Sequence, residues 1–181
     1  YITSKMTSQI QHAQNPTEEH PPFITLSREY GCGGDRLSRK LCETLSSMPG
    51  PDGRVRPWKR VTHEVIAQAA EEIGVDPEIV REMTYQKLDS FLVTSYFNVS
   101  FSKYQKPSAM TVRNAIARVI INFAQEGRVI ILGRGAASLT RHYQNSLHFR
   151  LQAPQSWRVK KVIEREQLPP DKAMKVLKRI D

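Results

Sequence analysis

Apolar residues form two short continuous runs along the chain, and both runs predict buried strands. Residues 23–27 (FITLS) and residues 129–132 (VIIL) contain no charged side chain, and a glycine-bearing segment follows each run. Such runs are typical of strands that are covered on both faces of a parallel sheet. We therefore expect these two strands to be adjacent, parallel and central. Residues 58–62 and 146–151 are weaker candidates for two more strands.

Helical spacing and chain-breaking residues predict helices between and after these strands. Leucines recur at every fourth position within residues 36–46, which indicates an amphipathic helix. Thr62 is the expected cap of a second helix, and Gly74 is its expected terminator. Strands that alternate with helices predict an α/β fold of three layers, in which helices flank a parallel sheet. Capping residues, prolines and glycines delimit the further helices at residues 62–73, 76–97, 108–125, 154–166 and 169–181.

Residues 1–22 differ in composition from the rest of the chain. They are rich in Ser, Thr, Gln and His, and they contain few large apolar side chains. Such a segment buries too little apolar surface to offset the entropy that is lost on ordering, so we expect a flexible arm. The remaining residues, 23–181, are enough for one domain with its own core.

The charge balance favours anionic partners. The chain carries 27 Lys and Arg against 18 Asp and Glu, a formal net charge of +9, which attracts nucleotides, nucleic acids or anionic membrane surfaces. Aromatic residues are not interleaved with the basic ones, so the pattern does not favour a nucleic-acid-binding protein. No apolar run approaches the ~18 residues of a membrane span, and the first residues do not have the pattern of a secretory signal.

Cysteine and histidine residues indicate neither a disulfide framework nor a metal site. The two cysteines, Cys32 and Cys42, are expected to be reduced thiols of a cytoplasmic protein. No histidine lies near Cys32 in the sequence to act as the base of a catalytic thiol. The five histidines lack metal-ligand spacing, so we predict no metal ion held by the protein alone.

A glycine-rich segment connects the first predicted strand to the helix that follows it. Gly31, Gly33 and Gly34 are three glycines within four residues, and glycines allow positive φ angles and a close approach of backbone N–H groups to a ligand. A following helix N-terminus favours an anion there, so we interpret the segment as a phosphate-binding loop. A plain strand-to-helix turn is the alternative, because short glycine motifs occur without function.

The stretch ITLSREYGCGGDRLSRKL resembles the opening of the cytidylate-kinase-like family, in which a REYGxGG segment replaces the ordinary Walker A loop. The resemblance continues through HEVIAQAAEEIG, DPEIVREM, EGRVIILGRGAASLTR and LHFRLQAPQSWRVKKVIERE, and it covers roughly residues 23–181. It implies a P-loop kinase fold, with ATP as phosphate donor, Mg²⁺ as cofactor and a nucleoside monophosphate as acceptor. By this resemblance we expect the family's lid arginines and a fifth strand to be missing from the given chain. The backbone of four loop residues would bind the donor phosphates: Gly31, Cys32, Gly33 and Gly34.

The loop departs from an ordinary Walker A loop at two positions. Gly34 stands where the lysine that reaches the β- and γ-phosphates is expected, and Arg36 stands where a magnesium-binding hydroxyl is expected. No Asp follows the second apolar run to act as a further metal ligand. Arg28, directly before the glycine loop, is the predicted substitute for the lysine charge, and Arg36 and Lys40 are the alternatives.

Arg134 is the candidate ligand for the acceptor's phosphate. It lies between two glycines directly after the second apolar run, where open α/β sheets bind their ligands. In the family that the chain resembles, the arginine of a GRD segment binds this phosphate, and Gly135 replaces the Asp of that segment here. A guanidinium group suits phosphate oxygens. Pairing of Arg134 with a core carboxylate is the alternative.

Arg158 is the candidate group for stabilising the transferring phosphoryl group. It lies with Arg165 on the helix that precedes the lid in a kinase of this type, and lid arginines neutralise the charge of that group. A solvated basic helix is the alternative for either residue.

Together these features predict an ATP-dependent phosphotransferase that acts on a nucleoside monophosphate, with cytidylate as a candidate acceptor. Phosphoryl transfer depends on positioning and charge, so no nucleophilic triad is expected. The alternative is a non-catalytic nucleotide- or phosphate-binding sensor on a degenerate P-loop kinase fold. The missing lysine and hydroxyl favour this alternative.

Overall fold

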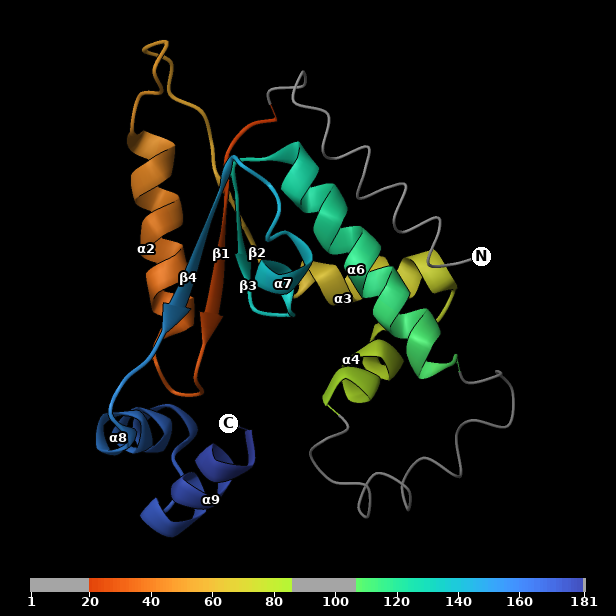
Figure 1. Ribbon diagram of the computed structural model, residues 1–181. Coiled ribbons are helices and arrows are strands. Elements are labelled where there is room, and N and C mark those ends of the chain that lie inside the picture. The colour runs from red at the N-terminus through yellow and green to blue at the C-terminus, as the bar shows by residue number, and fades with distance from the viewer. Residues whose placement is uncertain (1–19, 86–106, 181) are drawn as a thin grey trace. The chain divides into compact units, whose positions relative to one another are not determined.

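The computed structural model describes residues 20–85 and 107–180 (Figure 1). The chain falls into two compact units. The first contains residues up to 27, residues 34–61 and residues 121–150, and the second contains residues 28–33, 62–120 and those from 151 onwards. The elements are β1 (Phe23–Arg28), α2 (Gly34–Ser47), β2 (Lys59–Val61), α3 (Glu64–Ile73), α4 (Pro77–Tyr85), α6 (Ala109–Glu126), β3 (Val129–Leu132), α7 (Ala136–Leu139), β4 (Ser146–Leu151), α8 (Gln155–Glu166) and α9 (Pro170–Ile180).

The four strands form one parallel sheet in the order β2-β3-β1-β4. Strands β1 and β3 pair in parallel, with Ile24 opposite Ile130 and Leu26 opposite Leu132. Strand β2 pairs in parallel with the other edge of β3, where Lys59 lies opposite Val129. The prediction that the two apolar runs are adjacent, parallel and central is therefore confirmed, and so is the α/β class.

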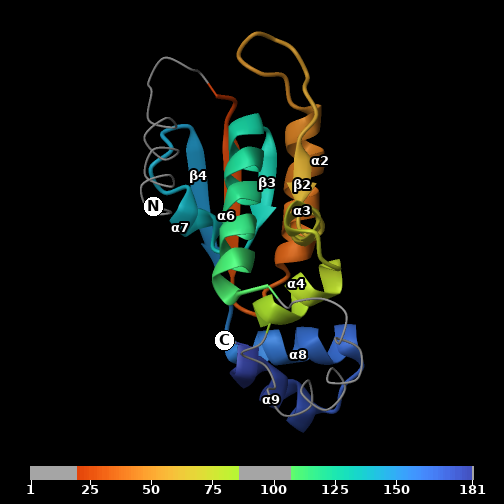
Figure 2. The same ribbon diagram turned by 90° about the vertical axis from the view of Figure 1, so that its right-hand side faces the viewer.

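The core of the first unit lies between the sheet and α2. Helix α2 lies against β2 and β3, and Figure 2 shows it running alongside the sheet. Its leucines Leu41 and Leu45 pack on a buried cluster of strand residues, as the predicted amphipathic helix requires. The strand residues of that cluster are Ile24, Leu26, Ile130 and Leu132.

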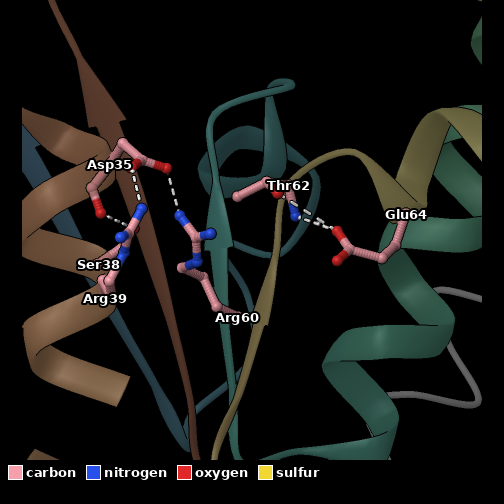
Figure 3. A network of polar contacts seen from close by, with 6 residues as sticks. All are labelled: Asp35, Ser38, Arg39, Arg60, Thr62 and Glu64. Carbon is pink, nitrogen blue, oxygen red and sulfur yellow. Dashed lines mark hydrogen bonds and ion pairs between the residues drawn. The ribbon is translucent and has the colours of Figure 1, made fainter. Parts of the chain in front are cut away.

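Two caps are predicted for helix α3 (Glu64–Ile73), and one of the two is wrong. Helix α3 ends at Gly74 in a left-handed conformation, with φ 67°, as predicted. Thr62 does not cap this helix. The N-cap residue is His63, which makes no side-chain capping hydrogen bond. Instead the carboxylate of Glu64 accepts a hydrogen bond from the Thr62 N–H at 2.7 Å (Figure 3), because a carboxylate in the first turn can reach back to an unpaired N–H.

Helix α4 begins where the sequence predicts the helix of residues 76–97 to begin, with Asp76 as its cap. The carboxylate of Asp76 accepts the Glu78 N–H at 2.7 Å, and Pro77 is the first helical residue. The structure describes this helix to Tyr85; the predicted continuation to residue 97 lies outside the described residues. No helix within residues 20–85 and 107–180 is both long enough and apolar enough to cross a membrane.

The first described residues are tied to the amino end of the sheet. The side-chain amide of Asn145 donates a hydrogen bond to the Pro21 carbonyl at 3.0 Å, and the Arg128 N–H donates to the Pro22 carbonyl at 2.6 Å. Gly127 lies so close to Pro21 that a Cβ atom there would overlap the Pro21 carbonyl. Residues 20–22 belong to the predicted flexible arm of residues 1–22, but they are hydrogen-bonded to the unit that contains the sheet. Residues 1–19 lie outside the described residues.

Candidate functional site

The glycine loop has the backbone conformation that its composition predicts. Gly31 and Gly33 adopt positive φ angles of 83° and 76°, which side chains on L-residues rarely permit. Between them the Cys32 N–H donates a hydrogen bond to the Glu29 carbonyl at 3.3 Å. Gly34 differs, because it is already the first residue of α2. Positive-φ residues that alternate with other residues, as Gly31 and Gly33 do, form the backbone concavities that bind anions.

The two positive-φ glycines are needed for different reasons. A Cβ atom on Gly31 would lie 2.9 Å from the Arg158 carbonyl oxygen and 3.2 Å from a methyl carbon of Val162. A Cβ atom on Gly33 would meet only the Trp157 ring, at 3.7 Å. Backbone contact with α8 thus excludes a side chain at Gly31, whereas φ alone disfavours one at Gly33.

Arg158 contacts the loop rather than solvent. Its side chain is only 10% exposed, and its Nε atom lies 3.3 Å from a carboxylate oxygen of Glu29. The Nε group also donates to the Ala153 carbonyl at 3.0 Å, and Nη1 donates to the Tyr30 carbonyl at 3.3 Å. A buried guanidinium group requires such partners. No role for Glu29 is predicted from the sequence, although Glu29 is the one acidic residue between Arg28 and Gly34.

Tyr30 makes a second set of contacts between the loop and α8. Its hydroxyl donates a hydrogen bond to the carboxylate of Glu166, and the guanidinium group of Arg165 lies 4.9 Å from the ring centroid. Arg165 also pairs with Glu166 at 2.6 Å. Burial raises the pKa of Tyr30, and the bond to Glu166 raises it further. For Glu166, burial alone raises the pKa, but the hydrogen bonds from Tyr30 and Arg165 outweigh it, so the net pKa is lowered.

At the start of α2, in the other unit, Asp35 is the centre of a charged network (Figure 3). One carboxylate oxygen pairs with Arg60 of β2, and the other accepts from Arg39 at 3.0 Å. Burial alone raises the pKa of Asp35, but the two guanidinium groups lower it below its ordinary value. An acidic side chain in the first turn also suits the helix dipole.

No hydroxyl occupies the magnesium-binding position of the loop. The assignment of that position to Arg36 is wrong: in the strict Walker A pattern the hydroxyl residue directly follows the lysine, so Asp35 holds the position after Gly34. Arg36, the next residue, is exposed. Both carboxylate oxygens of Asp35 are paired with arginines. Residues 20–85 and 107–180 contain no group of three or more His, Cys, Asp or Glu that could hold a metal ion. These donors do not fit a magnesium ion held by the protein itself.

Arg134 lies at the carboxyl end of the sheet, in a strained turn. Three consecutive residues after β3 have positive φ angles, 77° at Gly133, 59° at Arg134 and 72° at Gly135. The Gly133 N–H donates to the Leu26 carbonyl at 2.8 Å, which joins the turn to β1. A non-glycine residue at positive φ costs about 1–2 kcal/mol, and such strain concentrates at functional sites. The half-exposed Arg134 thus follows the carboxyl end of β3, and its role in binding the acceptor phosphate stays a prediction.

The other cations that were considered for the missing lysine lie on exposed surfaces. Arg28 is the exposed last residue of β1, Arg36 is exposed on α2, and Lys40 pairs with Glu43 at 3.8 Å. Among these, Arg28 precedes the loop directly, so it keeps its place as the candidate substitute.

Solved structures with a similar fold come from several bacteria. An uncharacterized protein from Eubacterium ventriosum matches with a TM-score of 0.55 at 16% identity, over 88% of this chain and 71% of that one. TT1252 from Thermus thermophilus matches with a TM-score of 0.45 at 14% identity, over 87% of this chain and 78% of that one. Shikimate kinase from Acinetobacter baumannii in complex with shikimate matches with a TM-score of 0.43 at 17% identity, over 90% and 76%. The first of these likenesses supports the α/β fold.

No curated protein matches the chain. A family model does match, and it spans the whole of the predicted domain, from residue 23 to residue 181. This match agrees with the resemblance carried by the REYGCGG loop. The chain belongs to the cytidylate kinase-like family.

Proposed function

We propose that this protein is an ATP-dependent phosphotransferase that acts on a nucleoside monophosphate, with cytidylate as a candidate acceptor. The observation that carries the proposal is the loop of positive-φ glycines, Gly31 and Gly33, between β1 and α2 of a cytidylate kinase-like chain. Parallel sheets with helices on their faces bind ligands at the carboxyl ends of their strands. The loop and the Arg134 turn both follow such ends.

In this proposal the donor phosphates bind to backbone N–H groups of four loop residues, namely Gly31, Cys32, Gly33 and Gly34. The Cys32 N–H then exchanges its long 3.3 Å hydrogen bond to the Glu29 carbonyl for a phosphate oxygen. Arg28 supplies the positive charge that a Walker lysine would supply. ATP enters with Mg²⁺, as is general for kinases. Asp35 is paired with Arg60 and Arg39, so we assign no protein ligand to the ion. The charge on the transferring phosphoryl group is then balanced mainly by arginines.

Arg134 binds the acceptor phosphate in the proposed complex. A planar guanidinium group can donate two parallel hydrogen bonds to phosphate oxygens, and the strained turn fixes the direction in which the side chain leaves the backbone. Arg158, which sequence analysis predicts at the transferring group, is buried against Glu29. We therefore propose that it supports the reaction through the loop.

A second function is favoured by one specific observation. The loop lacks both the lysine and the hydroxyl of a Walker A loop, and Asp35 brings a carboxylate to its end. A protein with such a loop could bind nucleotide as a sensor without turnover.

A coupled assay distinguishes the two functions. The protein is incubated with ATP, Mg²⁺ and each of the common ribo- and deoxyribonucleoside monophosphates in turn, and ADP formation is followed. Binding of a non-hydrolysable ATP analogue is measured in parallel by calorimetry. Turnover with one monophosphate supports the phosphotransferase. Binding without turnover across the panel supports the sensor, and absence of binding contradicts both.

A further inference from the structure

We propose that helix α8 sets the geometry of the phosphate-binding loop, and that Glu29, Tyr30, Arg158 and Glu166 are the positioning residues that make this connection. The inference rests on the proposed function only in calling the loop phosphate-binding. The contacts that carry it lie within one unit of the chain, in the segments 28–33 and 151–180.

The first contact joins the start of the loop to the start of α8. The guanidinium group of Arg158 pairs with the Glu29 carboxylate at 3.3 Å and also donates to the Tyr30 carbonyl at 3.3 Å. The Ala153 N–H, just before the helix, lies 3.4 Å from the same Glu29 carboxylate. A largely buried ion pair is held rigidly, because separating its charges leaves each without water or a partner.

The second contact joins the loop to the end of the same helix. The Tyr30 hydroxyl donates to Glu166, and Arg165 lies over the Tyr30 ring while it pairs with Glu166. Residues 158 and 166 are about two turns apart on α8. The loop is thus attached to the helix at two separate points, which restricts rotation as well as translation.

Between these points the loop backbone lies directly on the helix. The space for a Cβ atom on Gly31 is filled by the Arg158 carbonyl and by Val162. Val162 in turn packs with Ala173 and Leu177 of α9. The peptide groups around Gly31 and Cys32 therefore rest on a packed helical hairpin, and their N–H directions follow from its position. In an ordinary P-loop, the lysine and hydroxyl side chains help to fix the loop on its ligand.

The inference predicts that small changes at the second contact loosen the loop without unfolding the protein. Tyr30→Phe deletes one hydroxyl, and Glu166→Ala deletes its acceptor. Each should increase amide hydrogen exchange across residues 29–33 about tenfold or more, the effect expected for the loss of one hydrogen bond to a charged group. Binding of the non-hydrolysable ATP analogue should weaken by a similar factor. Glu166→Gln retains an acceptor and should behave more nearly like the parent protein.

The cysteines provide a second, independent measurement. Cys32 lies in the loop, whereas Cys42 lies in α2 and donates to the Trp58 carbonyl at 3.0 Å. Alkylation by iodoacetamide, followed at each cysteine by mass spectrometry, should accelerate at Cys32 in Tyr30→Phe and Glu166→Ala and stay unchanged at Cys42. Glu164→Gln, which breaks an exposed pair with Lys161 on the same helix and leaves Lys161 over the Trp157 ring, is the matched control and should change neither rate.

A double-mutant cycle tests whether the two residues act through one contact. The double variant of Tyr30→Phe and Glu166→Ala should exchange no faster than the faster single variant, because the bond is already lost. Loop exchange and Cys32 alkylation at parental rates in both single variants would overturn the inference. These two rates are measured without nucleotide, so they decide the inference even if the parent protein fails to bind the ATP analogue and the proposed function is thereby rejected.

Discussion

The carbonyl oxygen of Arg158 lies 2.9 Å from the place that a Cβ atom on Gly31 would occupy. The first turn of α8 therefore packs directly on the backbone of the glycine loop. This approach distinguishes Gly31 from the other positive-φ glycines of the described residues whose surroundings are open. The stability of a variant with a side chain at position 31 therefore reports on the packing of the loop that is proposed to bind phosphate.

Replacing Gly31 with Ala should destabilise the protein more than the same change at Gly53. Both positions have positive φ, 83° and 74°, but a Cβ on Gly53 would meet nothing within 4 Å. The Gly53→Ala control should cost about 1 kcal/mol from backbone strain alone. Gly31→Ala should cost about 2–4 kcal/mol, because the helix or the loop must also move. Urea denaturation measures both, and equal losses would contradict the packing described here.

Replacing Gly33 with Ala should weaken nucleotide binding while the fold persists. A Cβ there would have ordinary contact with the Trp157 ring at 3.7 Å, so the stability loss is the ~1 kcal/mol of positive φ. The added methyl group would lie at the backbone that is proposed to face phosphate, and affinity for an ATP analogue should fall at least ~10-fold. Calorimetry of the variant beside the Gly53→Ala control measures this; unchanged affinity would leave the segment as a simple turn.

Removing the Arg134 side chain should separate acceptor binding from donor binding. Arg134→Ala deletes a charged contact of ~2–5 kcal/mol, so kcat/KM for the monophosphate should fall by a factor of ~30 or more. Affinity for the ATP analogue should stay nearly the same. Arg141→Ala, at an exposed arginine bonded to its neighbour His142, is the control. A fall in donor affinity equal to the fall in kcat/KM would contradict the assignment.

Replacing Arg134 with Gly should raise stability while it weakens acceptor binding as much as Arg134→Ala does. Glycine adopts the φ of 59° at this position without the strain of an L-residue, and the net gain after the entropy of the unfolded chain is about 0.5–1 kcal/mol. Arg128 has a φ of 49° and lies at the opposite end of β3, so Arg128→Gly should stabilise similarly without loss of activity. Thermal unfolding and the kinase assay together compare the two. A loss of stability in Arg134→Gly would show that the side chain supports the fold.

Acid should weaken the contact between Tyr30 and Glu166. The pKa of Glu166 in the folded protein is below its ordinary value of 4.5, so its contribution to stability is fully present above the unfolded pKa. That contribution is lost as the pH falls through the lower folded pKa. Glu166→Gln should therefore show a shallower loss of stability below about pH 4.5 than the parent. Unfolding curves between pH 7 and pH 3 measure the difference, and parallel pH profiles would contradict the pairing.

The central strands and the glycine conformations could be predicted from the sequence because each depends on local properties. An unbroken apolar run such as VIIL needs cover on both faces, and β3 is fully buried. Gly74 ends α3 for the same kind of local reason. The Thr62 cap is wrong because the helix begins one residue later, with His63 as its N-cap, and the Glu64 carboxylate accepts the Thr62 N–H.

The contacts of the loop with α8 could not be predicted from the sequence. Tyr30 and Glu166 are separated by 136 positions, and nothing in the local pattern of either residue indicates the other. In the sequence, Arg158 is one of several cations on a basic helix, whereas in the structure its side chain is buried beside Glu29. Pairings of this kind join residues that are far apart in the sequence, so they depend on the tertiary structure and not on a local pattern.

The hydrogen bonds of Pro21 and Pro22 with Asn145 and Arg128 have a practical consequence for attaching the protein to a surface. They hold the start of the domain at the amino end of β1, whereas the Arg134 turn follows the carboxyl end of the neighbouring β3. A strand of six residues separates these ends by roughly 20 Å. An immobilisation tag or a fluorescent fusion on the amino-terminal side would therefore join the sheet away from Arg134, and biosensor measurements of nucleotide binding can be made with the protein tethered by that end.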